Sequence, residues 1–130
     1  MLAALPAPDL RVYFVWIPMV DGDEQDRARD WAAEISDPRV RHFWDGDTAC
    51  GRAFAAVLGV PADPDGGHPP TAWDAYLVYD GGARWSASPP TPAAWMHQLP
   101  VMGRRGRRLD GATLRADVTR ATTAGVAAAP

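Results

Sequence analysis

Residues 12–18 read Val-Tyr-Phe-Val-Trp-Ile-Pro, and this stretch decides the fold. A continuous β-branched and aromatic run closed by a proline predicts a strand that is buried on both faces, as in a parallel sheet. A chain of 130 residues, 47% of them apolar, suits one domain with its own core. We therefore expect an α/β protein with this strand at its centre.

Further elements follow in order. Asp21 and Glu24 have the spacing of a capping box before a helix that ends at residues 37–38, in which Ala28, Trp31, Ala32 and Ile35 recur at the spacing of a buried face. Residues 40–44 predict a short strand, which ends in the polar and aromatic cluster His42-Phe43-Trp44-Asp45. Asp47 or Thr48 can cap a second helix, which Gly59 ends. Residues 61–70 predict a surface loop, residues 73–79 and 83–85 an antiparallel hairpin, and residues 91–99 a short helix. The predicted order is β-α-β-α-β-β-α.

The C-terminal residues differ in composition. Residues 100–130 carry six Arg against Asp110 and Asp117, whereas residues 1–99 are acidic. Few large apolar side chains follow residue 102, so they offset little of the entropy lost on ordering. We predict a domain over residues 1–102 and a flexible Arg/Ala-rich tail over residues 103–130. The tail has no aromatic residue for base stacking, which argues against a nucleic-acid partner.

The element order resembles that of the thioredoxin-like fold, over about residues 10–99. Trp16 ends a buried strand before a loop and a helix, which is where that superfamily places its Cys-x-x-Cys motif. Pro70 and Thr71 resemble the proline-threonine segment, usually cis, that faces the motif. The loop here reads Ile17-Pro18-Met19-Val20-Asp21-Gly22-Asp23 and holds no cysteine, so dithiol exchange at that position is excluded.

Three hypotheses on function remain open. One is a redox-inert thioredoxin-like binding or accessory module, whose ligand is an extended peptide in a groove between Trp16–Asp23 and the Pro70 loop. Trp16, Pro18, Met19, Asp21, Pro70 and Thr71 are its expected binding residues. The alternative is a single-cysteine thiol oxidoreductase or thiol-transfer protein that uses Cys50 as nucleophile, at the first turn of the second helix. A structural homo-oligomer subunit, suggested by the six Trp, is a third hypothesis.

No metal or other cofactor is expected. The carboxylates of residues 21–26 lack the glycine and the terminal glutamate of a calcium loop, and His42, His68 and His97 have no partner at zinc-ligand spacing. The sequence has no apolar run of membrane-spanning length, and its first residues do not resemble a secretion signal. We therefore expect a soluble, cytoplasmic protein with a protein or peptide partner.

Overall fold

The computed structural model describes residues 3, 5, 7–62, 66–98 and 106–127. It divides the chain into two compact units, Met1–Gly51 (unit 1) and Arg52–Pro130 (unit 2), which are described here one by one. Within the described residues the fold is α/β, with three helices and five strands in two small sheets. The order predicted from the sequence is confirmed, apart from one additional two-residue strand.

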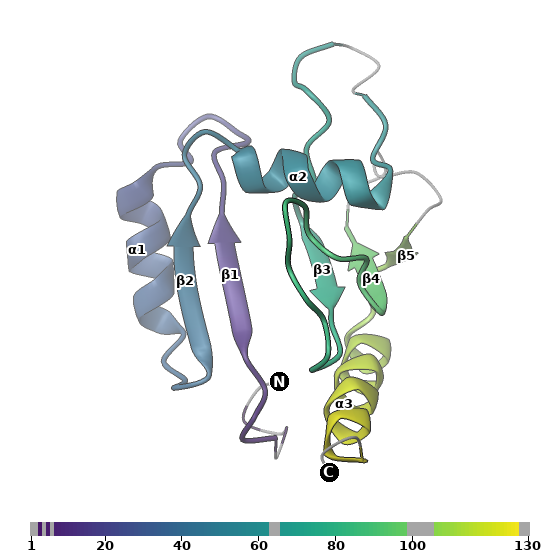
Figure 1. The fold of residues 1–130 in the computed structure, drawn as a ribbon. Coiled ribbons are helices and arrows are strands. Elements are labelled where there is room, and N and C mark those ends of the chain that lie inside the picture. Colours follow the sequence, from purple (N-terminus) through teal and green to yellow (C-terminus); the bar gives the residue numbers. More distant parts are fainter. Residues whose placement is uncertain (1–2, 4, 6, 63–65, 99–105, 128–130) are drawn as a thin grey trace. The chain divides into compact units, whose positions relative to one another are not determined.

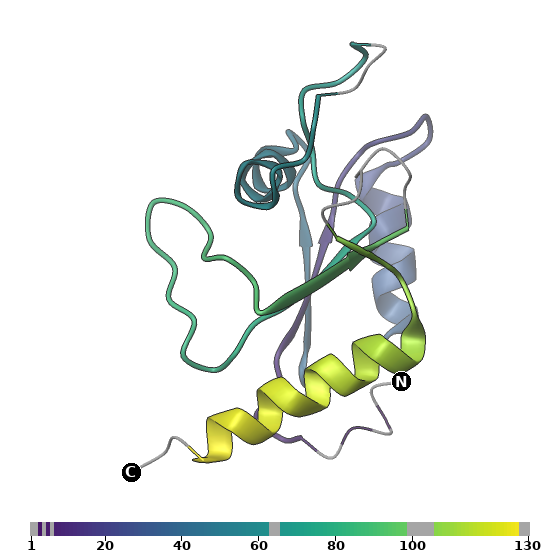
Figure 2. The ribbon, with the colours of Figure 1, turned by 90° about the vertical axis from the view of Figure 1, so that its right-hand side faces the viewer.

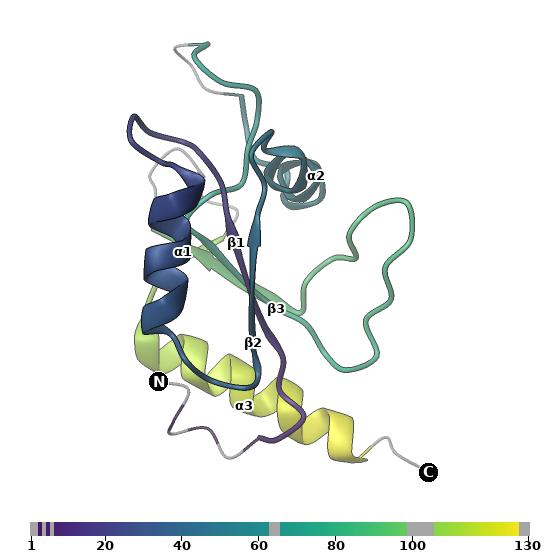
Figure 3. The same cartoon turned by 90° about the vertical axis from the view of Figure 1, so that its left-hand side faces the viewer.

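Unit 1 is a β-α-β motif. Strands β1 (Val12–Trp16) and β2 (Val40–Trp44) pair in parallel, with Val12 opposite Val40 and Trp16 opposite Trp44. Helix α1 (Gln25–Glu34) connects them and lies alongside the sheet in Figures 1 and 3. Its Ala28 is buried because the helix turns its small residues towards the unit's interior. The predicted capping box does not form, since no side chain caps this helix.

The strand β1 is not buried on both faces as expected. Its side chains alternate, with Phe14 and Trp16 half-buried and Tyr13 62% exposed. Trp31, which the helical spacing placed in the core, is also 62% exposed. Both differences follow from the small size of unit 1. Its single helix covers only one face of the sheet, and a sheet of two strands is too narrow to cover the whole inner side of the helix.

Helix α2 (Ala49–Leu58) begins in unit 1 and continues in unit 2. Asp45 caps it, because its carboxylate accepts hydrogen bonds from the backbone N–H groups of Ala49, Cys50 and Gly51. Gly59 ends it at φ +65°, and Val60 N–H donates to the Ala55 carbonyl at 2.9 Å. That bond is typical of a glycine-terminated helix, so the predicted end is confirmed.

Unit 2 is a three-stranded sheet between two helices. Strands β3 (Ala75–Val78) and β4 (Ala94–His97) are antiparallel, and β5 (Arg107–Arg108) pairs in parallel with β4. One core cluster joins the sheet to α2 and its C-terminal end through Ala55, Leu58, Val60, Ala72, Leu77 and Trp95. The other joins it to α3 (Gly111–Ala127) through Val78, Met96, Leu114 and Ala121.

The second half of unit 2 corrects two expectations. Residues 94–97 form a strand rather than a helix, and residues 83–85 are not a strand. The partner of β3 is therefore β4, and the long connection between them extends away from the strands as a loop (Figure 2). Trp95 and Met96 lie on opposite faces of the sheet, where Trp95 packs in the cluster with α2 and Met96 in the cluster with α3. A strand presents consecutive side chains to opposite faces, whereas an amphipathic helix would bury only one side.

Helix α3 lies within the segment that was predicted as a flexible tail. Asp110 caps α3 by accepting hydrogen bonds from the Thr113 N–H and hydroxyl groups, at 2.7 and 2.6 Å. These hydrogen bonds lower the pKa of Asp110. Asp117 is only 3% exposed and forms ion pairs with Arg107 and Arg120. The predicted boundary at residue 102 lies outside the described residues and stays a prediction.

Candidate functional site

The residues expected to bind a ligand lie in two separate units. Trp16 ends β1, and Pro18, Met19 and Asp21 follow in the loop before α1, all in unit 1. Pro70 and Thr71 belong to unit 2, where Thr71 is buried and its hydroxyl donates to the Pro69 carbonyl at 2.8 Å. The groove predicted between the two segments stays a prediction. The peptide bond before Pro70 is trans, whereas the resemblance implied cis.

The loop after β1 is held by one aspartate. The Asp23 carboxylate accepts hydrogen bonds from the backbone N–H groups of Met19 and Val20, each at 2.9 Å, and Asp23 N–H donates to the Val20 carbonyl at 3.0 Å. Gly22 adopts φ +89°, and the Arg27 guanidinium donates to its carbonyl. The loop is therefore a closed turn in which the side chains of Asp23 and Arg27 bond the backbone.

A hollow of about 250 Å³ lies beside this loop in unit 1. It is lined by the indoles of Trp16, Trp31 and Trp44, together with Ile17, Asp23, Glu24, Arg27 and Ala28. Its walls come from the carboxyl ends of β1 and β2, from the loop after β1 and from the first two turns of α1. The carboxyl end of parallel strands is where α/β proteins usually bind ligands.

Two of these indoles are fixed in place. The Trp16 indole N–H donates to His42 Nδ1 at 3.2 Å, and the Trp16, His42 and Phe14 rings stack with planes within 18° of one another. Trp44 lies over Gly46, where a Cβ atom would stand only 2.8 Å from the indole nitrogen. Trp31 has no such restraint among the described residues and is largely exposed. The hollow thus combines a rigid aromatic wall with one accessible aromatic side chain.

The hydrogen bond from Trp16 also fixes the tautomer of His42. An indole N–H can only donate, so Nδ1 must carry a lone pair and neutral His42 holds its proton on Nε2. That Nε2 atom is buried without a hydrogen-bond partner among the described residues. The hydrogen bond from Trp16 and the stacked rings thus fix the orientation of the His42 imidazole.

Cys50 is in an environment that disfavours the thiolate. Burial and the nearby Asp45 carboxylate raise the pKa of its thiol. The same carboxylate satisfies the N–H groups at the start of α2, which would otherwise have stabilised a negative sulfur. The helix start therefore does not activate this cysteine.

Sequence reasoning missed most of the hollow. Trp16 and the loop after it were expected to contribute, whereas Trp31 was assigned to the core and Trp44 was noted only within a polar and aromatic cluster. The sequence did contain a signal: Trp16 and Trp44 each end a predicted strand, and Trp31 lies on the helix that connects the two strands.

Two structural features are absent from the described part of the chain. It holds no cluster of three side chains suited to a metal ion. None of its helices has the length and apolar character needed to cross a membrane. Comparison with protein-family models, with curated proteins and with solved structures finds no match to this chain.

Proposed function

We propose that this chain is a thioredoxin-like domain that has no redox chemistry and binds a peptide through the hollow at Trp16, Trp31 and Trp44. The element order supports the resemblance: a parallel β-α-β motif precedes an antiparallel strand pair and a closing helix. The observation that carries the function is the aromatic hollow beside the loop that holds cysteines in the superfamily.

The size and charge of the hollow indicate its ligand. A volume of about 250 Å³ is smaller than the roughly 300–1,000 Å³ of sites for whole small molecules, so a single large side chain fits it better. Asp23 and Glu24 line it with only Arg27 to balance them. An indole face also attracts cations. The proposed ligand is therefore a peptide with an apolar side chain next to a Lys or Arg.

Selection from a displayed library of random heptapeptides tests this function. We expect enrichment of peptides in which a large apolar residue neighbours a basic one, and synthetic versions of them should bind the purified protein. Trp31→Ala should weaken that binding by about tenfold, as is typical when an aromatic side chain at the centre of an interface is truncated. Trp31 is exposed, so the substitution should not unfold the protein.

Trp85→Ala is the matched control. Trp85 is 59% exposed, close to the 62% of Trp31, but it lies in unit 2 and contacts Phe54 and Tyr79 instead of lining the hollow. It should leave peptide binding within about twofold of the parent. A library that yields no consensus, or binding that is equally sensitive to both substitutions, would overturn the proposal.

The absence of redox chemistry has its own test. The purified protein should not accelerate the reduction of insulin disulfides by dithiothreitol, because residues 17–23 contain no thiol. A lone cysteine also stalls at the mixed disulfide unless a second thiol resolves it. Turnover that Cys50→Ser abolishes would replace the binding module with the single-cysteine thiol enzyme.

A further inference from the structure

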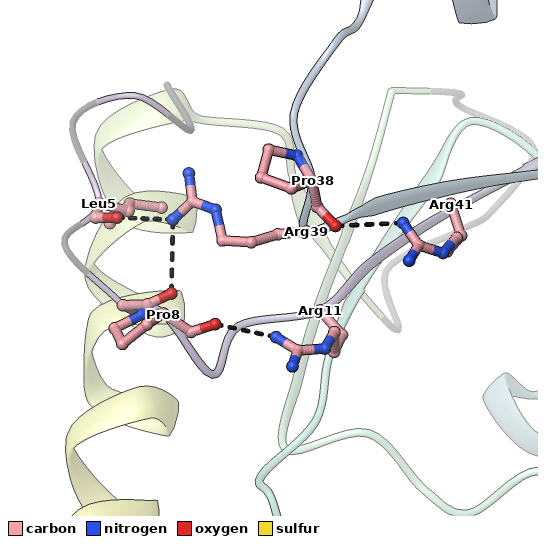
Figure 4. Close-up of a pocket in the computed structure, with 7 residues that line it drawn as sticks. Leu5, Pro8, Arg11, Pro38, Arg39 and Arg41 are labelled. Carbon is pink, nitrogen blue, oxygen red and sulfur yellow. Dashed lines mark hydrogen bonds between the residues drawn. The ribbon is translucent and has the colours of Figure 1, made fainter.

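A second hollow in unit 1 gathers arginines at the opposite end of the sheet. It has a volume of about 610 Å³ and is lined by Leu5, Ala7, Pro8, Arg11, Pro38, Arg39 and Arg41 (Figure 4). These residues come from the segment before β1, from the turn before β2 and, for Arg41, from the second position of β2. The parallel pairing of the two strands brings both segments to the amino ends of the sheet.

Arg39 builds the hollow and its charge is already matched. Its guanidinium forms two hydrogen bonds with the Asp37 carboxylate, at 2.9 and 2.7 Å, and donates to the carbonyls of Leu5 and Ala7. The hydrogen bonds that Asp37 accepts from Arg39 lower the pKa of the Asp37 carboxyl to about 2. Arg39 therefore ties the N-terminal segment to the turn and is not the group that would receive a ligand.

Arg11 and Arg41 are held differently. In each, Nη1 donates to two backbone carbonyls: those of Pro8 and Leu10 for Arg11, and those of Pro38 and Val40 for Arg41. Among the described residues, neither Nε nor Nη2 of these two side chains has a hydrogen-bond partner. Each guanidinium is thus oriented from one side, while the edge that can donate two parallel hydrogen bonds to an oxyanion stays available.

The charge around this hollow favours a small anion. No carboxylate lines it, although residues 1–51 contain ten Asp and Glu against five Arg, three of which are Arg11, Arg39 and Arg41. An extended polyanion such as a nucleic acid would be repelled by the acidic remainder of unit 1. A compact anion would meet chiefly Arg11 and Arg41, because the nearby Asp37 carboxylate is paired with Arg39. The volume of the hollow is that of a small-molecule site.

We infer that this hollow is a binding site for a small organic oxyanion, with a phosphate or carboxylate head between Arg11 and Arg41. The side chains of Leu5, Pro8 and Pro38 give the hollow an apolar wall, so the ligand carries an apolar group beside its charged head. This site is independent of the peptide-binding hollow, because the two share no residue.

A titration followed by nuclear magnetic resonance of the arginine Nε–H groups tests the site. Phenyl phosphate and benzoate supply the two head groups, inorganic phosphate lacks the apolar part, and benzyl alcohol lacks the charge. We expect saturable shifts of the Arg11 and Arg41 signals with phenyl phosphate or benzoate, at lower concentration than with inorganic phosphate. Benzyl alcohol should cause no such shifts.

In a titration read from the nuclear magnetic resonance signals of phenyl phosphate itself, the double variant Arg11→Gln/Arg41→Gln should bind at least about tenfold more weakly than the parent, since it lacks two charge-assisted contacts. Arg29→Gln is the control, because Arg29 is an exposed arginine of unit 1 that pairs with Asp26 on α1. It should change affinity less than twofold. If circular dichroism shows that the double variant is unfolded, the two single variants are measured instead, with about threefold loss expected from each.

Three outcomes would overturn the inference. The first is the absence of saturable shifts with either aromatic anion, and the second is an equal loss of affinity in Arg29→Gln. The third is binding of phosphatidylserine vesicles or of an oligonucleotide that depends on Arg11 and Arg41, without binding of the small anions. None of these outcomes bears on the peptide-binding proposal, so the two hypotheses fail separately.

Discussion

Truncation of Leu114 to alanine tests whether α3 belongs to the core of unit 2. Leu114 is 8% exposed and packs in one cluster with Val78, Met96 and Ala121. The substitution removes three carbon atoms, which at about 0.8 kcal/mol per methylene amounts to roughly 2.4 kcal/mol, and the remaining cavity adds to this. Alanine recovers a few tenths of a kcal/mol through its higher helix propensity. We expect a net loss of about 3 kcal/mol.

The assay is urea unfolding followed by far-ultraviolet circular dichroism. With a slope of about 1–2 kcal/mol per molar urea, the midpoint of Leu114→Ala should fall by about 1.5–3 M. Arg115→Ala changes the neighbouring exposed position of the same helix and should stay within about 0.5 kcal/mol of the parent. Leu114→Met conserves volume and should cost less than about 1.5 kcal/mol.

One result would refute this reasoning. If the midpoints of Leu114→Ala and Arg115→Ala move by the same small amount, the helix does not dock on the sheet. The C-terminal residues would then be the independent tail that their composition suggests. A loss confined to Leu114→Ala would instead show that a segment poor in large apolar residues contributes to the core.

Three further predictions concern single sites. Gly106→Ala should lower the free energy of unfolding by about 1–3 kcal/mol in the same urea assay, because a Cβ atom there would stand 2.7 Å from the Trp95 ring. The control Gly81→Ala should be nearly neutral, because a Cβ atom at that position meets open space. The pKa of Asp37 is lowered to about 2, so its ion pair with Arg39 stabilises the folded state fully at any pH above the ordinary pKa of an aspartate. This contribution is lost as the pH falls from about 4 to about 2, so urea unfolding of Asp37→Asn should lack that part of the acid dependence. Cys50, whose thiol pKa is raised, should react with iodoacetamide more slowly than free cysteine at neutral pH, and a fast reaction there would contradict the assigned environment.

Local sequence signals predicted the first half of the chain well. The apolar run at residues 12–17 and Gly59 mark boundaries that depend on backbone chemistry, so neighbouring residues suffice to locate them. The end of the first helix was located less well, because α1 ends at Glu34 and the predicted stop was at residues 37–38. The site was predicted in part for the same reason. The predicted end of a strand was enough to place Trp16 and the loop after it at the site. The place of Trp31 in the hollow could not be predicted in this way, because it depends on how much of α1 the two-stranded sheet covers.

Long-range pairing decided the second half. Thr91 and Pro92 have the local signature of a helix start, yet residues 94–97 form β4, because pairing with β3 places Trp95 and Met96 on opposite faces of a covered sheet. The predicted order of elements was confirmed even though its last helix is formed by other residues.

The sequence by itself determined an α/β chain, its N-terminal β-α-β motif and the lack of a thiol pair in the loop after β1, since these depend on residue type and local spacing. Only the tertiary structure decided that α3 is part of the core and that Arg11 and Arg41 share a hollow. Asp117 shows the physical reason. A carboxylate in a helix normally indicates a solvated face, but here Arg107 of β5 pairs with it, and this partner is brought near only by the fold.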